Sequence, residues 1–471
     1  MLRATPTPLP ASTLSQLSVA TVSPVTMPPS SRFSRFFLAL AASLPSLFAF
    51  EGTAHALQPL NDFLEHARTW NPDNRAAHAT VDQRDAEVGV SNGNLEPSLQ
   101  FNALYTHNQF DVDTGSLIGA LPAGIMLPNT IIQPYNQIDG NIILTVPIIN
   151  VANWDRRGVS KATLDGAKAD EANAGITVQK NVTRDYYQLL GYEAVLQSAT
   201  KNRDVAHHNV KLARDKKESG TGSELDVQRA LADEARAEQN VTAAQLNVTN
   251  SRRDLYSLSG MAPDEASTFP DDDLHPEEPL ESWMASAQSV PSVKSAAAAR
   301  ASAVRASHAA RTGWLPTLTG TAEEKGTNAT GFTGGHSAFY LLQVAANWKL
   351  DNTVLPQIRQ QNAIAAAARA NEDKARQAAD DAVYKDWQQV KADIDASRSA
   401  RAQVASTKLA ASLAEDRYAN GVATQLDVLQ ARQDAFAADV ARIQADSDLA
   451  YARIALRIDS GRFQPKEDTR R

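Results

Sequence analysis

The feature that most constrains this chain is a stretch that occurs twice, 201 residues apart. It reads GTGSELDV at residues 220–227 and GVATQLDV at residues 421–428, and the register continues without a gap to residues 260 and 461. Both copies stand between long segments rich in alanine and charged residues. We therefore expect an internally duplicated fold, built from two copies of one long unit.

In each copy the residues predict a helix, a tight turn and a second helix that runs back beside the first. Gly220 and Gly421 can adopt the left-handed backbone conformation that ends a helix at low cost. Ser223 and Thr424 stand where an N-cap residue belongs, and each is followed three residues later by an aspartate, as in a capping box. The duplicated stretch thus predicts the turn of a helical hairpin.

The length of these helices is set by stretches without proline. Residues 148–262 and 357–464 contain none, and both stretches are rich in residues that favour helix. One continuous helix over residues 151–219 would be roughly 100 Å long at 1.5 Å per residue. Ordinary globular helices are much shorter, so the pattern indicates rods, coiled coils or a helical barrel.

Alternating apolar and polar residues predict four strands, at about 97–108, 136–147, 315–325 and 337–349. Period-two alternation over about ten residues is typical of a strand with one face toward lipid and the other toward a polar lumen. Soluble sheets show the same alternation, so this pattern alone leaves both settings open.

The predicted elements follow the same order twice: helix, two strands, long helix, turn and return helix. Four prolines and three consecutive aspartates interrupt the chain between the two sets and predict a linker. The expected parts are a first repeat at 57–262 with its helical hairpin at about 151–259, a linker at 263–290, a second repeat at 291–461 with its hairpin at about 353–459, and a tail at 462–471.

Residues 1–56 are expected to be a secretory signal with a long N-terminal extension. Two arginines flank an apolar run at residues 36–50, and a small-x-small cleavage site follows at residues 54–56. A membrane anchor is the alternative, but the short run and Pro45 argue against it. Met27 could be the true start of translation.

Composition excludes several classes of function. The chain has no cysteine, which excludes disulfides, thiolate metal sites and a cysteine nucleophile. Its formal net charge of −8 argues against nucleic acid as a partner. After the signal no run of about 18 apolar residues occurs, so a membrane-embedded part would have to use strands. We find no catalytic constellation, cofactor motif or metal site, and Asp271-Asp272-Asp273 is interpreted as part of a solvated linker.

On these residues the chain resembles the TolC-like outer-membrane efflux proteins over nearly the whole mature sequence. The resemblance is carried by RYANG at residues 417–421 followed by TQLDVL at residues 424–429, and by the weaker twin at 220–227. Leu315-Pro316 and the strand exit WKLD at residues 348–351 support it. It implies a mainly helical protein with a small membrane β-barrel. Three chains would form a 12-strand β-barrel, continued by a long periplasmic α-helical barrel.

The resemblance also implies a function and a set of partners. The protein would be a homotrimer in the outer membrane of a Gram-negative bacterium, in contact with outer-membrane lipid. It would be a passive exit duct without enzymatic activity or cofactors, joined through a periplasmic adaptor to an inner-membrane transporter. The rival interpretation is a secreted periplasmic coiled-coil scaffold or adaptor without a barrel, which leaves the four alternating runs unexplained.

The resemblance places the functional residues at the two turns. Asp427, Asp226 and Gln430 are expected to line the periplasmic aperture, although both aspartates could serve only as helix caps. The family often has a second acid where Gln430 stands, so a gate of two acidic rings would be halved here. The family often has valine before the turn glycine, where this chain has Ser219 and Asn420. The turn tips expected to dock the adaptor are Gly220, Thr221, Ser223, Gly421, Val422 and Thr424.

Overall fold

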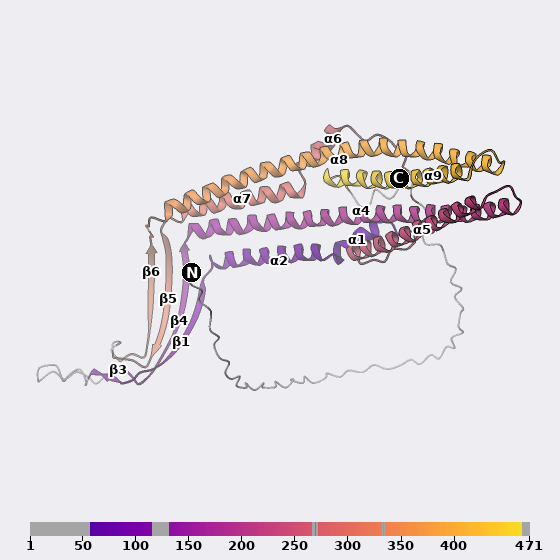
Figure 1. The fold of residues 1–471 in the computed structure, drawn as a ribbon. Helices are drawn as coiled ribbons and strands as arrows, with labels where there is room; N and C mark the ends of the chain where they lie inside the picture. The colour runs from indigo at the N-terminus through magenta and orange to yellow at the C-terminus, as the bar shows by residue number, and fades with distance from the viewer. Residues whose placement is uncertain are drawn as a thin grey trace, which may run out of the picture. The chain divides into compact units, whose positions relative to one another are not determined.

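The computed structural model describes residues 57–114, 131–265, 269, 272–331, 333, 335–349 and 351–463. The predicted signal, the tail beyond residue 463 and Asp271 lie outside these residues. The chain separates into two units, Met1–Gly52 and Thr53–Arg471. The second unit is the one described below, and most of its residues are helical (Figure 1).

The second unit follows one order of elements twice (Figure 1). A short pair of strands, β2 (Val112–Asp113) and β3 (Ile131–Gln133), lies between the first two expected strands. The first half contains α1 (Leu60–Trp70), α2 (Pro72–Gly93), β1 (Ser98–His107), β4 (Asn136–Ile149), α4 (Val151–Glu218) and α5 (Glu224–Ser259). The second half contains α6 (Leu280–Ala287), α7 (Pro291–Thr312), β5 (Thr317–Thr327), β6 (Ala338–Asn347), α8 (Val354–Ala419) and α9 (Gln425–Asp459).

The two long helices, α4 with 68 residues and α8 with 66, form where the chain has no proline beyond the first turn. Asn150 separates β4 from α4 and caps the helix, because its side chain accepts a hydrogen bond from the amide of Asn153. Pro356 lies in the first turn of α8, where a missing amide proton costs nothing. Within the described part of the chain, no helix combines the length and the apolar character needed to cross a membrane.

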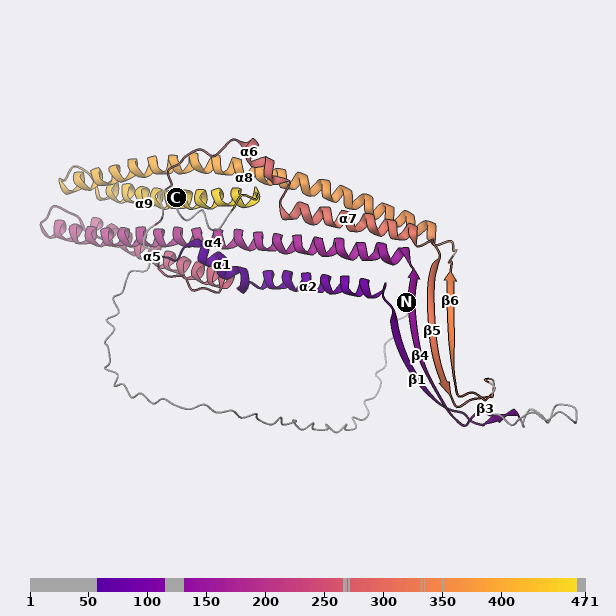
Figure 2. The same cartoon turned by 180° about the vertical axis from the view of Figure 1, so that it is seen from behind.

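Each long helix pairs with its return helix, α4 with α5 and α8 with α9, and the two pairs lie side by side (Figures 1 and 2). Their main core lies where α1 packs across α4 and α5. There Phe63 is fully buried in one cluster with Leu189 and Leu255, and the centroid of its ring lies 5.8 Å from that of Tyr186. Elsewhere along the helices, alanines supply many of the buried contacts, which allows close helix packing.

Four strands form one antiparallel sheet in the order β1-β4-β5-β6. They fall at the four alternating runs of the sequence. Directly opposed residues share a face, so the register divides the side chains into a polar face and an apolar face. The face that carries most polar residues includes Gln100, Asn102, Asp139, Asn141, Thr321, Glu323, Lys325 and Gln343, together with Leu104, Ile143, Phe339 and Leu341. The apolar face includes Leu99, Phe101, Tyr105, Ile138, Ile142, Leu144, Val146, Ala322, Tyr340, Leu342 and Val344.

Within the expected linker at 263–290, part of residues 272–287 packs on the second helix pair. Residues 280–287 form α6. Arg453 of α9 donates to the carboxylate of Asp272 at 3.1 Å and to the carbonyl of His275 at 2.8 Å. Trp387 of α8 donates to the carbonyl of Glu278 at 2.9 Å. Asp272 therefore binds a residue of α9, whereas Asp273 stays exposed and bonds His275.

A cluster of charged groups joins the two helix pairs near the end of α9. Lys180 of α4 forms an ion pair with Asp459, the last residue of α9. Burial is the main reason that the pKa of Asp386 in α8 rises to about 7, and a hydrogen bond and charge repulsion from Asp459 raise it further. The ammonium group of Lys180 opposes this rise. Asp386 therefore keeps its proton to a higher pH than an ordinary aspartate does.

Candidate functional site at the helical turns

The first turn joins α4 to α5 through Gly220, which has the left-handed φ of +74° that the sequence predicted. The amides of Thr221 and Gly222 both donate to the carbonyl of Lys216 at 2.9 Å, which satisfies the end of α4. Nothing lies within 4 Å of the place where a Cβ of Gly220 would stand. The backbone conformation, rather than crowding, is thus what requires glycine there.

The second turn joins α8 to α9 in the same way. Gly421 has a φ of +76°. The amides of Val422 and Ala423 donate to the carbonyl of Arg417 at 2.8 and 3.2 Å. Lys216 and Arg417 are equivalent in the 201-residue register, so the two turns agree in their hydrogen bonds as well as in their sequence.

Both return helices begin with the predicted capping box. The carboxylate of Asp226 accepts from the amide of Ser223 at 3.2 Å, and that of Asp427 accepts from the amide of Thr424 at 2.9 Å. Hydrogen bonds from the amide and hydroxyl of Thr424 lower the pKa of Asp427, and the charge of Arg417 lowers it further. Asp427 is therefore a helix cap that stays ionised.

The three residues predicted to line an aperture differ in their exposure to solvent and in their neighbours. Asp427 and Gln430 are both exposed on α9, and their spacing of three places them on the same face of the helix. Asp226 is half-buried on α5. Burial of Tyr418 is the main cause of its raised pKa, and the negative charge of Asp226 raises that pKa further. Within one protomer, Asp427 and Gln430 thus form one exposed patch, while Asp226 faces the neighbouring turn.

Lys216 ties the two turns together, which the sequence did not indicate. Its ammonium group donates to the carbonyl of Tyr418 and lies 3.9 Å from the centroid of the Tyr418 ring, in a cation–π contact. The tyrosine is buried at this place. The turns of the two helix pairs are therefore held as neighbours within one chain.

A second tie lies farther along the helices, where the buried Arg432 of α9 contacts the other three. It donates to the carboxylate of Asp233 in α5 at 3.2 Å and to the carbonyl of Asn202 in α4 at 3.1 Å. Its Nε also lies 3.6 Å from the carboxylate of Glu415 in α8. The equivalent position of the first repeat is Leu231. The difference between an arginine in one repeat and a leucine in the other was a signal in the sequence that pointed to this contact, and it was missed.

The tips also expose apolar side chains. Val422 is 70% exposed, Leu225 57% and Leu426 53%. Gly220, Thr221, Ser223, Gly421 and Thr424 are exposed beside them. Apolar groups gathered on an exposed surface are typical of a protein–protein contact.

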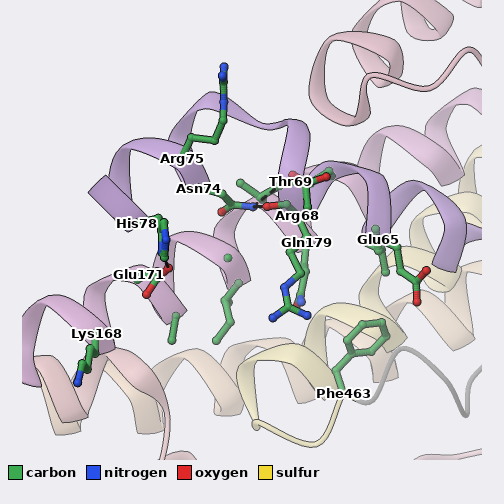
Figure 3. A pocket seen from close by; sticks show the side chains of 16 residues that line it. Glu65, Arg68, Thr69, Asn74, Arg75, His78, Lys168, Glu171, Gln179 and Phe463 are labelled. Carbon is green, nitrogen blue, oxygen red and sulfur yellow. Dashed lines mark hydrogen bonds and ion pairs between the residues drawn. The ribbon is translucent and has the colours of Figure 1, made fainter. Parts of the chain in front are cut away.

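A cavity of about 1050 Å³ lies between α1, α2 and α4, with Phe463 at its edge (Figure 3). His78 and Glu171 meet across it at 2.8 Å, and this hydrogen bond is the main cause of the raised pKa of His78. The hydroxyl of Thr69, which also lines the cavity, donates to the carbonyl of His66 rather than to a base. Among its described residues the cavity thus brings no nucleophile together with a base.

One group of possible metal ligands occurs among the described residues, formed by Asp272, Asp273 and His275. Arg453 already binds Asp272, as described above. The ring of His275 makes a hydrogen bond with Asp273, which is the main cause of the lowered pKa of Asp273. These contacts explain why the three residues lie together: they anchor the inter-repeat segment to α9.

Comparison with protein families gives one match, which covers both halves of the chain. The model of a family described as "Outer membrane efflux protein" matches residues 63–261 and 285–461. Among characterised proteins, the chain is similar to the outer membrane efflux protein BepC of Brucella suis, with 27% identity over 285 residues. That match covers 59% of this chain and 61% of the relative, so the chain spans about three-fifths of the length of BepC.

Solved structures share the fold. The CmeC outer membrane channel of Campylobacter jejuni gives a TM-score of 0.74 at 18% identity, covering 88% of each chain. The outer membrane protein VceC of Vibrio cholerae gives a TM-score of 0.71 at 17% identity, covering 85% of this chain and 96% of that one. The predicted TolC-like fold is therefore confirmed for most of the chain.

Proposed function

Because the chain belongs to the outer membrane efflux protein family, we propose that three copies form a passive exit duct for substrates delivered by an inner-membrane transporter. The protein is located in the outer membrane, and its helical part extends into the periplasm. The duct carries substrates without chemical change, so the protein has no enzymatic activity. The observation that best supports the duct is the two-faced sheet with two open edges.

The sheet cannot remain open in lipid. Strands β1 and β6 are its edges, and unpaired backbone groups are not tolerated in the hydrocarbon region. Since the four strands alternate in direction, β6 of one copy is antiparallel to β1 of the next. Three copies would close a barrel of twelve strands, an even number within the known range. The apolar face would meet lipid and the polar face would line the lumen.

The helices would continue this duct into the periplasm. Each of α4 and α8 is roughly 100 Å long at 1.5 Å per residue, and each begins close to the end of a strand. The turns therefore lie at the far end of the helices from the sheet. The repeated element order supports a duplication, with repeats at 57–262 and 291–461 that contribute equally to the tube.

Asp427 and Gln430 would line the aperture at the periplasmic end of this tube. Three copies of the Asp427 carboxylate around a narrow mouth would attract cations. The contacts of Lys216 and Arg432 hold the two turns of one chain as a single body, so opening the mouth would require these contacts to rearrange. The exposed tips around Val422 and Leu426 would then dock a periplasmic adaptor.

Two measurements test the duct. Cell fractionation should recover the protein in the outer membrane, and it should migrate as a trimer in gels when unboiled. The purified trimer should form open pores in planar bilayers. A soluble periplasmic monomer without pore activity would instead support the coiled-coil scaffold and refute the duct.

A further inference from the structure

One carboxylate stands among apolar residues on the apolar face of the sheet, whose far end also carries His107 and Asn136. The register places Glu324 of β5 between Ile142 of β4 and Tyr340 of β6, and Phe101 of β1 completes the row. The side chain is exposed, and no described residue bonds to it. The preceding residue, Glu323, points to the polar face and accepts a hydrogen bond from Asn141 at 2.7 Å. Two adjacent glutamates thus lie on opposite faces of one strand.

Glu324 lies near the end of the sheet that is farther from the long helices. It is three residues before the end of β5 at Thr327, and Tyr340 is two residues after the start of β6. Tyrosine side chains prefer the level of lipid headgroups. The row beyond consists of Ala103, Gly140, Gly326 and Ala338. A Cβ at either glycine would meet nothing closer than 3.8 Å, so the space beside the carboxylate toward the headgroups is open.

The charges around this end decide which ligand fits. The described residues at 107–113, 131–139 and 323–340 contain one lysine, Lys325, which lies on the polar face. The same ranges contain five acids: Asp111, Asp113, Asp139, Glu323 and Glu324, of which Asp139 and Glu323 lie on the polar face with Lys325. A lipid phosphate would be repelled here unless a cation stood between the two anions. A carboxylate among apolar groups likewise needs a positive partner.

We propose that Glu324 and a phosphate group of an outer-leaflet lipid hold a divalent cation between them. Mg²⁺ and Ca²⁺ take oxygen ligands, and Mg²⁺ is commonly bound by one or two carboxylates together with phosphates and water. This inference rests on the proposed duct, because it requires the apolar face of the sheet to contact lipid. It adds a cation-dependent lipid contact on the outside of the barrel, repeated once per copy.

The test uses the full-length trimer in vesicles of phosphatidylcholine, with or without added phosphatidic acid, in Mg²⁺ or in EDTA. The variant is Glu324→Gln, and the matched control is Glu323→Gln on the other face of the same strand. We expect Mg²⁺ to raise the melting temperature of the wild-type trimer by roughly 2 °C or more, only in vesicles that contain phosphatidic acid. Glu323→Gln should keep this rise and Glu324→Gln should lose it. Electron paramagnetic resonance should likewise detect protein-dependent Mn²⁺ binding that Glu324→Gln loses.

Several outcomes would overturn the inference. Equal stabilisation of all three proteins by Mg²⁺ would assign the effect to the bilayer alone. Stabilisation by phosphatidylethanolamine in EDTA, lost in Glu324→Gln, would show a direct contact with an amine headgroup. If the wild type and Glu323→Gln fail to insert as trimers, the proposed duct itself is contradicted. This outcome differs from a loss of the Mg²⁺ effect in inserted trimers, which contradicts only the cation site.

Discussion

Replacing Arg432 by leucine, the residue at the equivalent position of the first repeat, should loosen the turns. The substitution leaves the carboxylate of Asp233, whose side chain is 11% exposed, without its cationic partner. Breaking a buried ion pair by removing one partner costs about 3–5 kcal/mol. The half-exposed Glu415 adds little, because exposed pairs contribute at most about 1 kcal/mol. We therefore expect Arg432→Leu to lose about 3 kcal/mol of local stability per chain.

Native-state hydrogen exchange is the suitable assay, because it reports on the ends of the helices separately from the rest of the trimer. A loss of about 3 kcal/mol corresponds to a roughly hundredfold faster exchange of amides around residues 202–233 and 415–432. The double variant Arg432→Leu/Asp233→Leu removes both charges and should recover much of the protection. Arg398→Leu, which removes an exposed pair with Asp395, is the matched control and should change little. Equal exchange in Arg432→Leu and Arg398→Leu would refute the reasoning.

Three further predictions concern the turns and the charged cluster. Gly421→Val should lower the yield of trimer because a β-branched residue is strained at a φ of +76°, whereas Gly421→Asn should be milder; a normal yield in the valine variant would contradict this account of the turn. Asp427→Asn should lower the cation selectivity of the trimer in planar bilayers, and unchanged selectivity would leave Asp427 as a helix cap alone. Because the pKa of Asp386 rises from 3.8 to about 7, the folded state binds the extra proton, so stability should fall as pH rises through this range. Asp386→Asn should flatten that fall in thermal unfolding, and an unchanged slope would show that Asp386 does not cause it.

The sequence predicted the features that depend on neighbouring residues. Gly421 and Thr424 determine the turn and the cap of α9 through contacts within a few residues, so local patterns were sufficient. The long helices followed in the same way from the absence of proline. The alternating runs likewise indicated the strands, because the period of two is a property of each strand alone.

The contacts that join distant segments could not be predicted in this way. Lys216 reaches Tyr418 across 202 residues, and Arg432 reaches Asn202 across 230. Such pairs depend on how the two helix pairs pack, which a single sequence does not determine. Asp272 of the inter-repeat segment was interpreted as solvated for the same reason, since its partner Arg453 lies far along the chain.

The central claim, that the sheet closes into a barrel between copies, is tested most directly by cross-linking its two edges. The chain has no cysteine, so Asn102→Cys on β1 and Gln343→Cys on β6 would be the only thiols, both on the polar face. A short bis-maleimide should then yield covalent trimers in denaturing gels. The control pair, Asn141→Cys and Lys325→Cys, lies opposite within one chain and should leave monomers. If the control pair is cross-linked within its chain but the edge pair yields only monomers in the same gels, closure of the barrel between copies would be contradicted.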